Sequence, residues 1–154
     1  MLTIYVDADA CPVKPEVYRV ARRYGLRVAV VANAPLRVPA NPLIELVVRR
    51  GFGAADDWIA GQAGPGDIVV TADIPLASRV LKNGASALGP TGKAFTADSI
   101  GVALGMRDFH RHLREATGGQ TYNAGFARQD RSRFLNALEN EIQAVRRRSG
   151  TSRS

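Results

Sequence analysis

The sequence predicts a single α/β domain in which helices cover both faces of a mainly parallel sheet. Short apolar runs rich in valine and isoleucine alternate along the chain with segments whose apolar residues recur at helical spacing. Turn signals built from glycine, proline and asparagine separate the two kinds of segment. Strands that alternate with helices in this way indicate three layers, with the sheet in the middle.

Five segments have the character of strands. The first, Leu2 to Val6, alternates apolar and polar residues and ends in Asp7-Ala8-Asp9. The segment 43–48 is also compatible with a helix, and we assign it as a strand because a valine pair and Gly51 bound it. The remaining strands are expected over 27–32, 68–71 and 85–88, where the apolar runs are compact enough to be buried.

Each strand except the second is followed by a segment with helical character. Pro12 and Pro75 suit the first turns of two helices, because the φ angle of proline is already helical. Asp130 is placed to cap the last helix, whose apolar face runs to Val145. The helices are expected over 13–24, from Asp56, over 75–82, from about Asp98 and from Asp130, with a glycine-rich loop over 117–128.

The size and composition of the chain indicate one globular domain. Its 154 residues are 45% hydrophobic and 23% charged, and no internal repeat marks a second domain. We assign residues 1–147 to the domain and expect the Arg/Ser tail, 148–154, to be disordered. No apolar run is long enough to span a membrane and the N-terminus lacks the basic region of a signal peptide, so we expect a cytoplasmic protein.

A single cysteine allows neither an intrachain disulfide nor a cysteine-rich zinc site. Cys11 has no second cysteine to pair with in the chain, and a cysteine-rich zinc site cannot form. A cysteine-based phosphatase loop requires an arginine where this chain has Val17, so a small buried residue is the better interpretation of Cys11.

The charge balance points to an anionic partner. The net charge is +7 and the isoelectric point about 10.3, which favours polyanions such as RNA. The same excess is equally compatible with genomic base composition plus a basic tail. Arg107, Arg111 and Arg114 fall on one helical stripe, which is either a solvated face or a surface that holds phosphates.

Polar residues gather where the predicted strands end. Asp7, Asp9, Asn33, Thr71 and Asp73 all follow or close apolar runs. In a parallel α/β sheet the ligand site lies beyond the carboxyl ends of the strands, so these side chains should converge. Positions two apart in an extended chain point the same way, which should set Asp7 and Asp9 side by side.

Converging carboxylates favour a divalent cation. Clustered like charges are costly unless a cation neutralises them, and Mg²⁺ or Mn²⁺ prefers oxygen ligands. Asp98, and either Asp56 or Asp57, could complete a set formed by Asp7, Asp9 and Asp73. Taken singly, Asp9 and Asp73 are equally well explained as helix N-caps, and Asn33 and Thr71 as groups that bond the ends of strands.

Four motifs resemble a known bacterial family. In chain order they are Asp7-Ala8-Asp9-Ala10-Cys11-Pro12, Ala32-Asn33 with Leu36-Arg37-Val38-Pro39, Thr71-Ala72-Asp73-Ile74-Pro75-Leu76-Ala77 and Met106-Arg107-Asp108. They closely resemble the YaiI/YqxD family over nearly the whole chain. That family is grouped with PIN-like domains, α/β folds in which carboxylates bind Mg²⁺ or Mn²⁺ and cleave RNA.

The resemblance implies roles for individual residues. It implies that Asp7 is the acid of the first strand and Asp73 the acid after a later strand. PIN-like nucleases usually carry a further acid on an intervening helix, for which Glu45, Asp56 and Asp57 are the candidates. Substrate contacts are expected from Asn33, Arg37, Thr71 and Arg107.

Three functions follow from these observations. The first is a metal-dependent nuclease that acts on RNA through Asp7, Asp9 and Asp73. The second is a phosphatase of the haloacid-dehalogenase type, with Asp7 as nucleophile and Asp9 as acid and base, although the later acidic pair and the cap region of that class are missing. The third is a module that binds RNA without catalysis, whose binding would depend on salt and need no metal.

Overall fold

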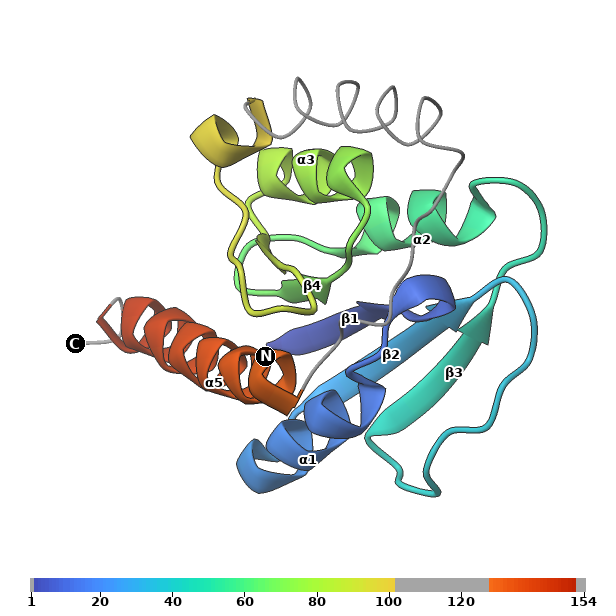
Figure 1. Cartoon of the computed structure of the whole chain (residues 1–154), viewed down its shortest axis with the longest axis horizontal. Helices are drawn as coiled ribbons and strands as arrows, with labels where there is room; N and C mark the ends of the chain where they lie inside the picture. Colours follow the sequence, from blue (N-terminus) through green and yellow to red (C-terminus); the bar gives the residue numbers. More distant parts are fainter. Residues whose placement is uncertain (1, 102–127, 152–154) are drawn as a thin grey trace.

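A five-stranded parallel sheet forms the centre of the protein (Figure 1). The structure is a computed structural model, and it describes residues 2–101 and 128–151. The strand order is β3-β2-β1-β4-β5, so the first strand of the sequence is the central one. The strands are β1 (Thr3–Asp7), β2 (Arg27–Ala32), β3 (Ile44–Val48), β4 (Ile68–Val70) and β5 (Ser86–Leu88), and all four pairings are parallel.

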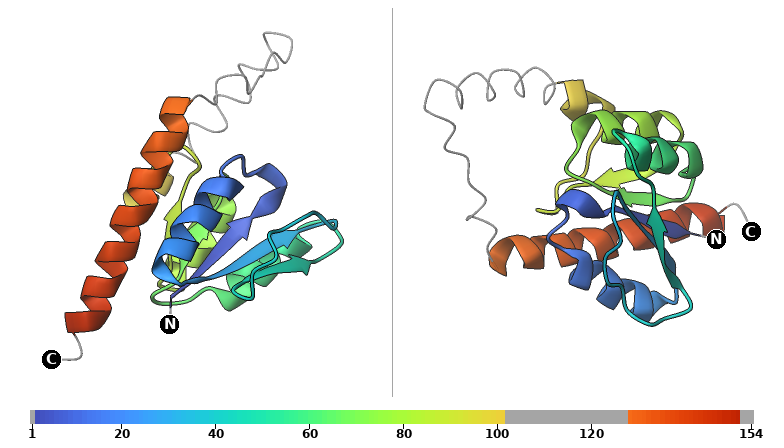
Figure 2. Two further views of the ribbon diagram at one scale, coloured as in Figure 1. Left: turned by 90° about the horizontal axis from the view of Figure 1, so that it is seen from below. Right: turned by 90° about the vertical axis from the view of Figure 1, so that its right-hand side faces the viewer.

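Helices cover both faces of this sheet (Figures 1 and 2). Helices α1 (Lys14–Tyr24) and α5 (Arg128–Thr151) lie on one face. Helices α2 (Ala54–Gln62) and α3 (Ile74–Lys82) lie on the other. The predicted three-layer α/β domain is therefore confirmed, and the arrangement is consistent with a PIN-like fold.

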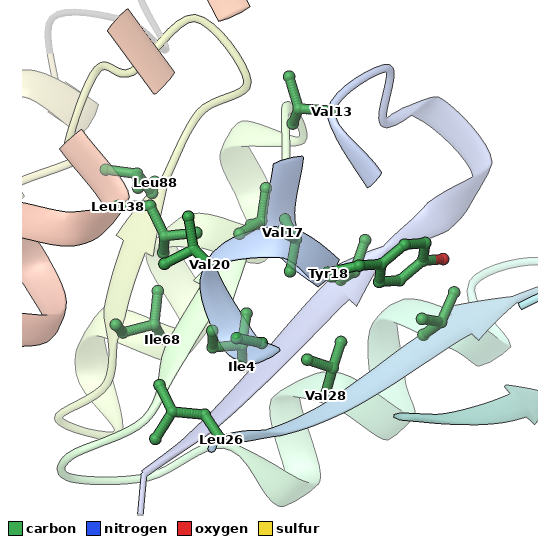
Figure 3. Close-up of a cluster of buried hydrophobic side chains, with 14 of the residues drawn as sticks. Ile4, Val13, Val17, Tyr18, Val20, Leu26, Val28, Ile68, Leu88 and Leu138 are labelled. Atoms are coloured by element: carbon green, nitrogen blue, oxygen red, sulfur yellow. The ribbon is translucent and has the colours of Figure 1, made fainter. Parts of the chain in front are cut away.

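Alternation along the strands divides the core into two parts. In β1, Ile4 and Val6 belong to the cluster under α1 and α5, whereas Tyr5 faces the cluster under α2 and α3. Such alternation is expected because successive side chains of a strand point to opposite faces. Figure 3 shows the first cluster, in which Ile4 and Ile68 from the sheet meet side chains of α1 and Leu138 of α5.

The register of the central strands positions the candidate site. Val6 of β1 is aligned with Val70 of β4, so Asp7 and Thr71, the next residues along each chain, share one edge of the sheet. Asp7 is also aligned with Val31 of β2, two residues before Asn33. The carboxyl ends of β1, β2 and β4 therefore meet where the sequence placed its polar residues.

Two helix starts differ from the predictions. The chain forms a 3₁₀ helix, η1 (Ala8–Ala10), directly after β1, and α1 begins only at Lys14, so Pro12 precedes the helix and Pro15 occupies its first turn. Helix α5 begins at Arg128, which places Asp130 inside the first turn rather than at the N-cap. An acid there is still favoured, because the N-terminal end of a helix carries partial positive charge.

Other sequence expectations concern segments at the boundaries of the described residues. Helix α5 continues to Thr151, into the stretch expected to be a disordered tail, and 152–154 lie outside the described residues. The predicted helix from Asp98 is seen as a helical segment over 97–101, and the glycine-rich loop lies almost wholly outside the described part. Among the described helices, none combines the length and apolar character needed to cross a membrane.

Candidate active site

Asp7 is the buried acid at the centre of the sheet edge. It closes the central strand β1, only 8% of its surface is exposed, and its Oδ2 accepts a hydrogen bond of 2.8 Å from Thr71 Oγ1. Burial, together with the negative charges of Asp56, Asp73 and Asp9, raises the pKa of Asp7 to about 6, against the lowering effect of the Thr71 hydrogen bond. The pKa therefore lies close to neutral pH, as is common for groups that exchange protons in active sites.

Thr71 joins the two acids that the sequence placed on separate strands. It follows β4, is 1% exposed, and its Oγ1 both donates to Asp7 and accepts from the backbone N–H of Asp73 at 2.9 Å. A hydroxyl can do both at once because it carries one donor and two acceptor lone pairs. Thr71 therefore links the carboxylate of Asp7 to the backbone of Asp73 at this edge, a structural role.

Asp73 is the N-cap of α3. Its Oδ1 accepts a hydrogen bond of 2.9 Å from the backbone N–H of Leu76, as the capping interpretation predicted. Capping engages one carboxylate oxygen and fixes the orientation of the group. A carboxylate has a second oxygen, so the cap is compatible with a further role for Asp73 at the same edge.

Asp9 does not stand beside Asp7 in the way that strand alternation predicted. The chain leaves the extended conformation at Ala8, and Asp9 lies on η1 with its side chain exposed. Its two carboxylate oxygens accept from the backbone N–H of Asn33 at 3.3 and 3.2 Å. Asp9 therefore connects η1 to the end of β2, while its charge still acts on Asp7.

Of the three candidates for a further acid, Asp56 is the one whose charge acts on Asp7. It lies in the first turn of α2, where burial raises its pKa and the negative charges of Asp73, Asp57 and Asp9 add to the effect, opposed by Arg79. Asp57 points elsewhere, since its Oδ1 pairs with Arg79 at 2.8 Å and its side chain is 70% exposed. Glu45 lies on β3 and is exposed. The sequence shows two adjacent acids at the start of a helix, and this pattern does not indicate which of them faces the sheet edge.

Three predicted site residues have no observed link to this group. Asp98 is exposed at the start of the 97–101 segment, and its charge is not among those acting on Asp7 or Asp56. Arg37 is exposed in the loop between β2 and β3. Arg107 lies outside the described residues.

Asn33, predicted as a substrate contact, makes structural hydrogen bonds at this edge. Its side-chain Nδ2 donates to the backbone oxygens of Arg49 at 2.9 Å and Gly51 at 3.4 Å. The same residue donates its backbone N–H to Asp9. Asn33 thus holds the segment that follows β3 against the acidic edge.

Lys14, in the first turn of α1, contacts the backbone next to the acidic edge. Lys14 Nζ donates to the backbone oxygens of Ala8 and Cys11, at 3.2 and 2.8 Å, and so closes η1. A lysine in a first helical turn is ordinarily solvated, so the sequence carries no signal for this role of Lys14. Cys11 itself is buried, and burial raises the pKa of its thiol, which agrees with a packing role.

The donor set fits a hydrated divalent ion better than a closed metal site. In the described ranges 2–101 and 128–151, no three His, Cys, Asp or Glu side chains are grouped closely enough to hold a metal ion. Four carboxylates nevertheless lie within electrostatic range of one another: Asp7, Asp9, Asp56 and Asp73. Mg²⁺ is commonly held by one or two carboxylates with water and substrate phosphates as its remaining ligands, and this set can supply such ligands.

The fold and this edge define the class of protein: a three-layer parallel α/β domain with coupled carboxylates beyond the central strands. A sequence comparison gives the family. The pattern described as "Uncharacterized BCR, YaiI/YqxD family" matches residues 5–144, and the chain belongs to that family. The expected family membership is therefore confirmed.

Its relatives are similar over almost their full lengths. A "UPF0178 protein" of Parvibaculum lavamentivorans is 55% identical over 149 residues, covering 96% of this chain and 98% of the relative. One from Rhodospirillum rubrum is 57% identical over 148 residues, covering 95% and 99%. One from Caulobacter sp. is 55% identical over 151 residues, covering 96% and 98%. No solved structure matches the chain.

Proposed function

We propose that the protein is a divalent-metal-dependent nuclease that hydrolyses phosphodiester bonds of RNA at the edge formed by Asp7, Asp56 and Asp73. The observation that supports this proposal is the buried carboxylate of Asp7, whose pKa is raised to about 6 among other acids. Placing a carboxylate there lowers stability, since each neighbouring negative charge disfavours its ionised form. Such a cost is typical of a functional site.

A cation would relieve this repulsion. Asp7 and Asp73 are the carboxylates that would hold Mg²⁺ or Mn²⁺, and the charge of the ion would also offset the negative charges of Asp9 and Asp56. When bound, the ion would neutralise phosphate charge and lower the pKa of a bound water. The net charge of +7 agrees with a polyanionic substrate.

The residues of the chain supply orientation and negative charge. Thr71 fixes the rotamer of Asp7 by a 2.8 Å hydrogen bond, and the cap on α3 fixes Asp73. Fixed carboxylates act without the reorganisation that solvated ones require. With a pKa of about 6, Asp7 is mainly ionised at neutral pH and therefore carries the negative charge that would attract a cation.

Cleavage of a labelled single-stranded RNA tests this proposal. The wild-type protein should cut in Mn²⁺ or Mg²⁺ and not in EDTA, whereas Asp7→Asn and Asp73→Asn should each lose activity about 100-fold or more. Both substitutions preserve the fold, because asparagine accepts the Thr71 hydrogen bond and caps helices as well as aspartate does. Asp57→Asn is the matched control, since this acid is exposed and paired with Arg79, and it should remain active.

Three results would contradict the proposal. Equal cleavage by wild type and both site variants would show that a contaminant or another site is responsible. Metal-independent RNA binding without any cleavage would instead identify the module that binds RNA without catalysis. A phosphoenzyme trapped on Asp7 would point to the phosphatase chemistry considered from the sequence.

A further inference from the structure

The most exposed large hydrophobic side chain of the described residues lies at the same end of the sheet as the acids. Phe52 has a relative exposure of 108%, whereas Leu43, the other exposed large hydrophobic among the described residues, has 38%. Phe52 belongs to the segment 49–53, which joins β3 to α2 and which we call the β3–α2 loop. Because β3 is parallel to the other strands, this loop lies at their carboxyl ends.

The β3–α2 loop is held in place by hydrogen bonds at both ends. The backbone N–H of Arg49 donates to Ala32 at 2.9 Å, and the Asn33 amide donates to the oxygens of Arg49 and Gly51. The backbone N–H of Ala54 donates to Gly51 at 3.2 Å. The ring of Phe52 is thus presented to solvent by a loop whose backbone is bonded on either side of it.

Two glycines make this presentation possible. Gly51 and Gly53 have φ angles of +109° and +73°, in a region that L side chains rarely adopt. They flank Phe52 directly and let the chain turn sharply on both sides of it. A loop that directed Phe52 into the core would not require positive φ angles on both sides of this residue.

The charges around the ring suit an anionic strand. Arg49 and Arg50 precede Phe52 and are exposed, and the guanidinium of Arg49 lies 5.4 Å from the centre of the Trp58 ring. The nearest exposed acid on α2, Asp57, is already paired with Arg79. The loop therefore offers an aromatic face next to two positive charges, which is the usual combination for binding single-stranded nucleic acid.

Asn33 connects this loop to the acids. Its backbone N–H binds the Asp9 carboxylate and its side chain binds the loop backbone, so one residue separates the two features. Asp56 lies three residues beyond Gly53, in the first turn of the helix that the loop begins. A strand bound at Phe52 would therefore pass close to the proposed catalytic edge.

We infer that the β3–α2 loop docks an unpaired nucleic-acid strand, with a base stacked on Phe52 and neighbouring phosphates bound by Arg49 and Arg50. The inference rests on the proposed function for its substrate class and names the form of that substrate. In a duplex both faces of each base are already stacked, so the ring of Phe52 selects unpaired segments. Stacking tolerates any base, so the loop binds without sequence preference.

Binding of a fluorescein-labelled ten-nucleotide oligo-U, followed by anisotropy in EDTA, tests the inference. Phe52→Ala should weaken binding about 5- to 150-fold, the loss that follows from removing one stacked base, and Phe52→Trp should restore it. Leu43→Ala is the matched control, because it truncates an exposed apolar side chain at the opposite end of β3 and should bind as wild type does. A blunt duplex should bind more weakly and respond little to Phe52→Ala.

The salt dependence tests the arginines. Arg50→Gln should reduce the slope of log affinity against log salt by about 0.7, the value for one phosphate contact to a single strand. Arg27→Gln, which removes an exposed arginine from the start of β2 at the other edge, should leave the slope unchanged. The same measurement with oligo-dT compares DNA with RNA. If Phe52→Ala loses similar affinity for both oligonucleotides, the loss is due to base stacking.

Several results would overturn the inference. Unchanged affinity in Phe52→Ala, or equal binding of duplex and single strand, would remove the role of the ring. A wild-type dimer that Phe52→Ala converts to a monomer in sedimentation velocity would show that Phe52 contacts a second copy of the chain instead. Binding is measured in EDTA, so it is independent of metal-dependent cleavage. If the wild-type protein does not cleave RNA but Phe52→Ala loses affinity, only the proposed function is defeated. If the wild-type protein cleaves RNA with metal but Phe52→Ala binds normally, only this inference is defeated.

Discussion

Asp7→Asn should stabilise the protein at neutral pH while removing its activity. Asp7 is 8% exposed, and its pKa is raised from 3.8 to about 6. That difference corresponds to about 3 kcal/mol by which ionised Asp7 destabilises the folded state. Asparagine keeps the shape of the side chain and an oxygen that accepts from Thr71, but carries no charge.

The direction of the pH dependence follows from proton binding. Since the folded pKa of Asp7 lies above the unfolded one, the folded state binds more protons between about pH 4 and pH 6. Wild-type stability therefore falls as the pH rises through this window and levels off above the folded pKa. The variant lacks this loss, so the two proteins should have similar stability near pH 4 and differ by up to about 3 kcal/mol at pH 7.5.

Urea denaturation followed by circular dichroism at pH 4, 5, 6 and 7.5 measures the difference between the two free energies of unfolding. Asp57→Asn serves as the control, because this exposed acid should show no comparable gain at pH 7.5. A difference that does not change with pH, or a variant that is less stable at every pH, would refute the argument that burial and neighbouring acids oppose the charge of Asp7.

Three further predictions concern the same edge and the packing around it. Thr71→Val removes the hydroxyl that donates to Asp7 and accepts from Asp73, so the free energy of unfolding in urea should fall by about 1–3 kcal/mol, and the pKa of Asp7 measured by NMR titration should rise further. Gly92→Ala should lower the melting temperature by several degrees, since Gly92 has a φ of +92° and a Cβ there would lie 2.7 Å from the backbone oxygen of Arg133; an unchanged melting temperature would mean that the turn is not seated on α5 in this way. Mn²⁺ at about ten times its dissociation constant should stabilise wild type by about 1.4 kcal/mol in a thermal shift assay and leave Asp7→Asn unaffected, whereas equal shifts in both proteins would place the ion elsewhere.

The layers of the fold could be predicted because burial leaves a strong pattern in the sequence. Strands buried on both faces are almost entirely apolar, as in Ile68–Val70, and the segments between them keep one apolar face. The ambiguous segment near Leu43 proved to be a strand, since it pairs along β2 over its whole length. Long-range pairing of this kind overrides a local pattern that suits two structures.

The local errors came from short turns that no hydrophobic pattern marks. The 3₁₀ turn at Ala8–Ala10 separates Asp7, which points inward, from Asp9, which is exposed. Strand alternation cannot anticipate a turn of three residues. Pro12 misled the helix boundary for a similar reason, because Pro15 suits a first helical turn equally well.

The sequence predicted where the candidate site lies, but only the folded structure shows how its side chains are held. The carboxyl-end rule placed Asp7 and Asp73 at one edge, and Thr71 joins them. Choosing Asp56 over Asp57 depends on which face of α2 turns to the sheet, and that helix has little amphipathic pattern to read. The exposure of Phe52 was invisible in the sequence, where an aromatic residue between glycines suits a buried turn as well as an exposed one.

The position of α5 has a consequence for synthesis of the protein on the ribosome. Phe134, Leu138, Ile142 and Val145 of α5 complete the cluster that covers one face of the sheet. All five strands precede α5 in the sequence, so the sheet can assemble on the nascent chain while this face is still open to water. Until translation has passed Val145, the growing polypeptide therefore exposes an apolar surface that chaperones recognise, and a stalled or prematurely terminated product would be a target for proteolysis rather than a partly active domain.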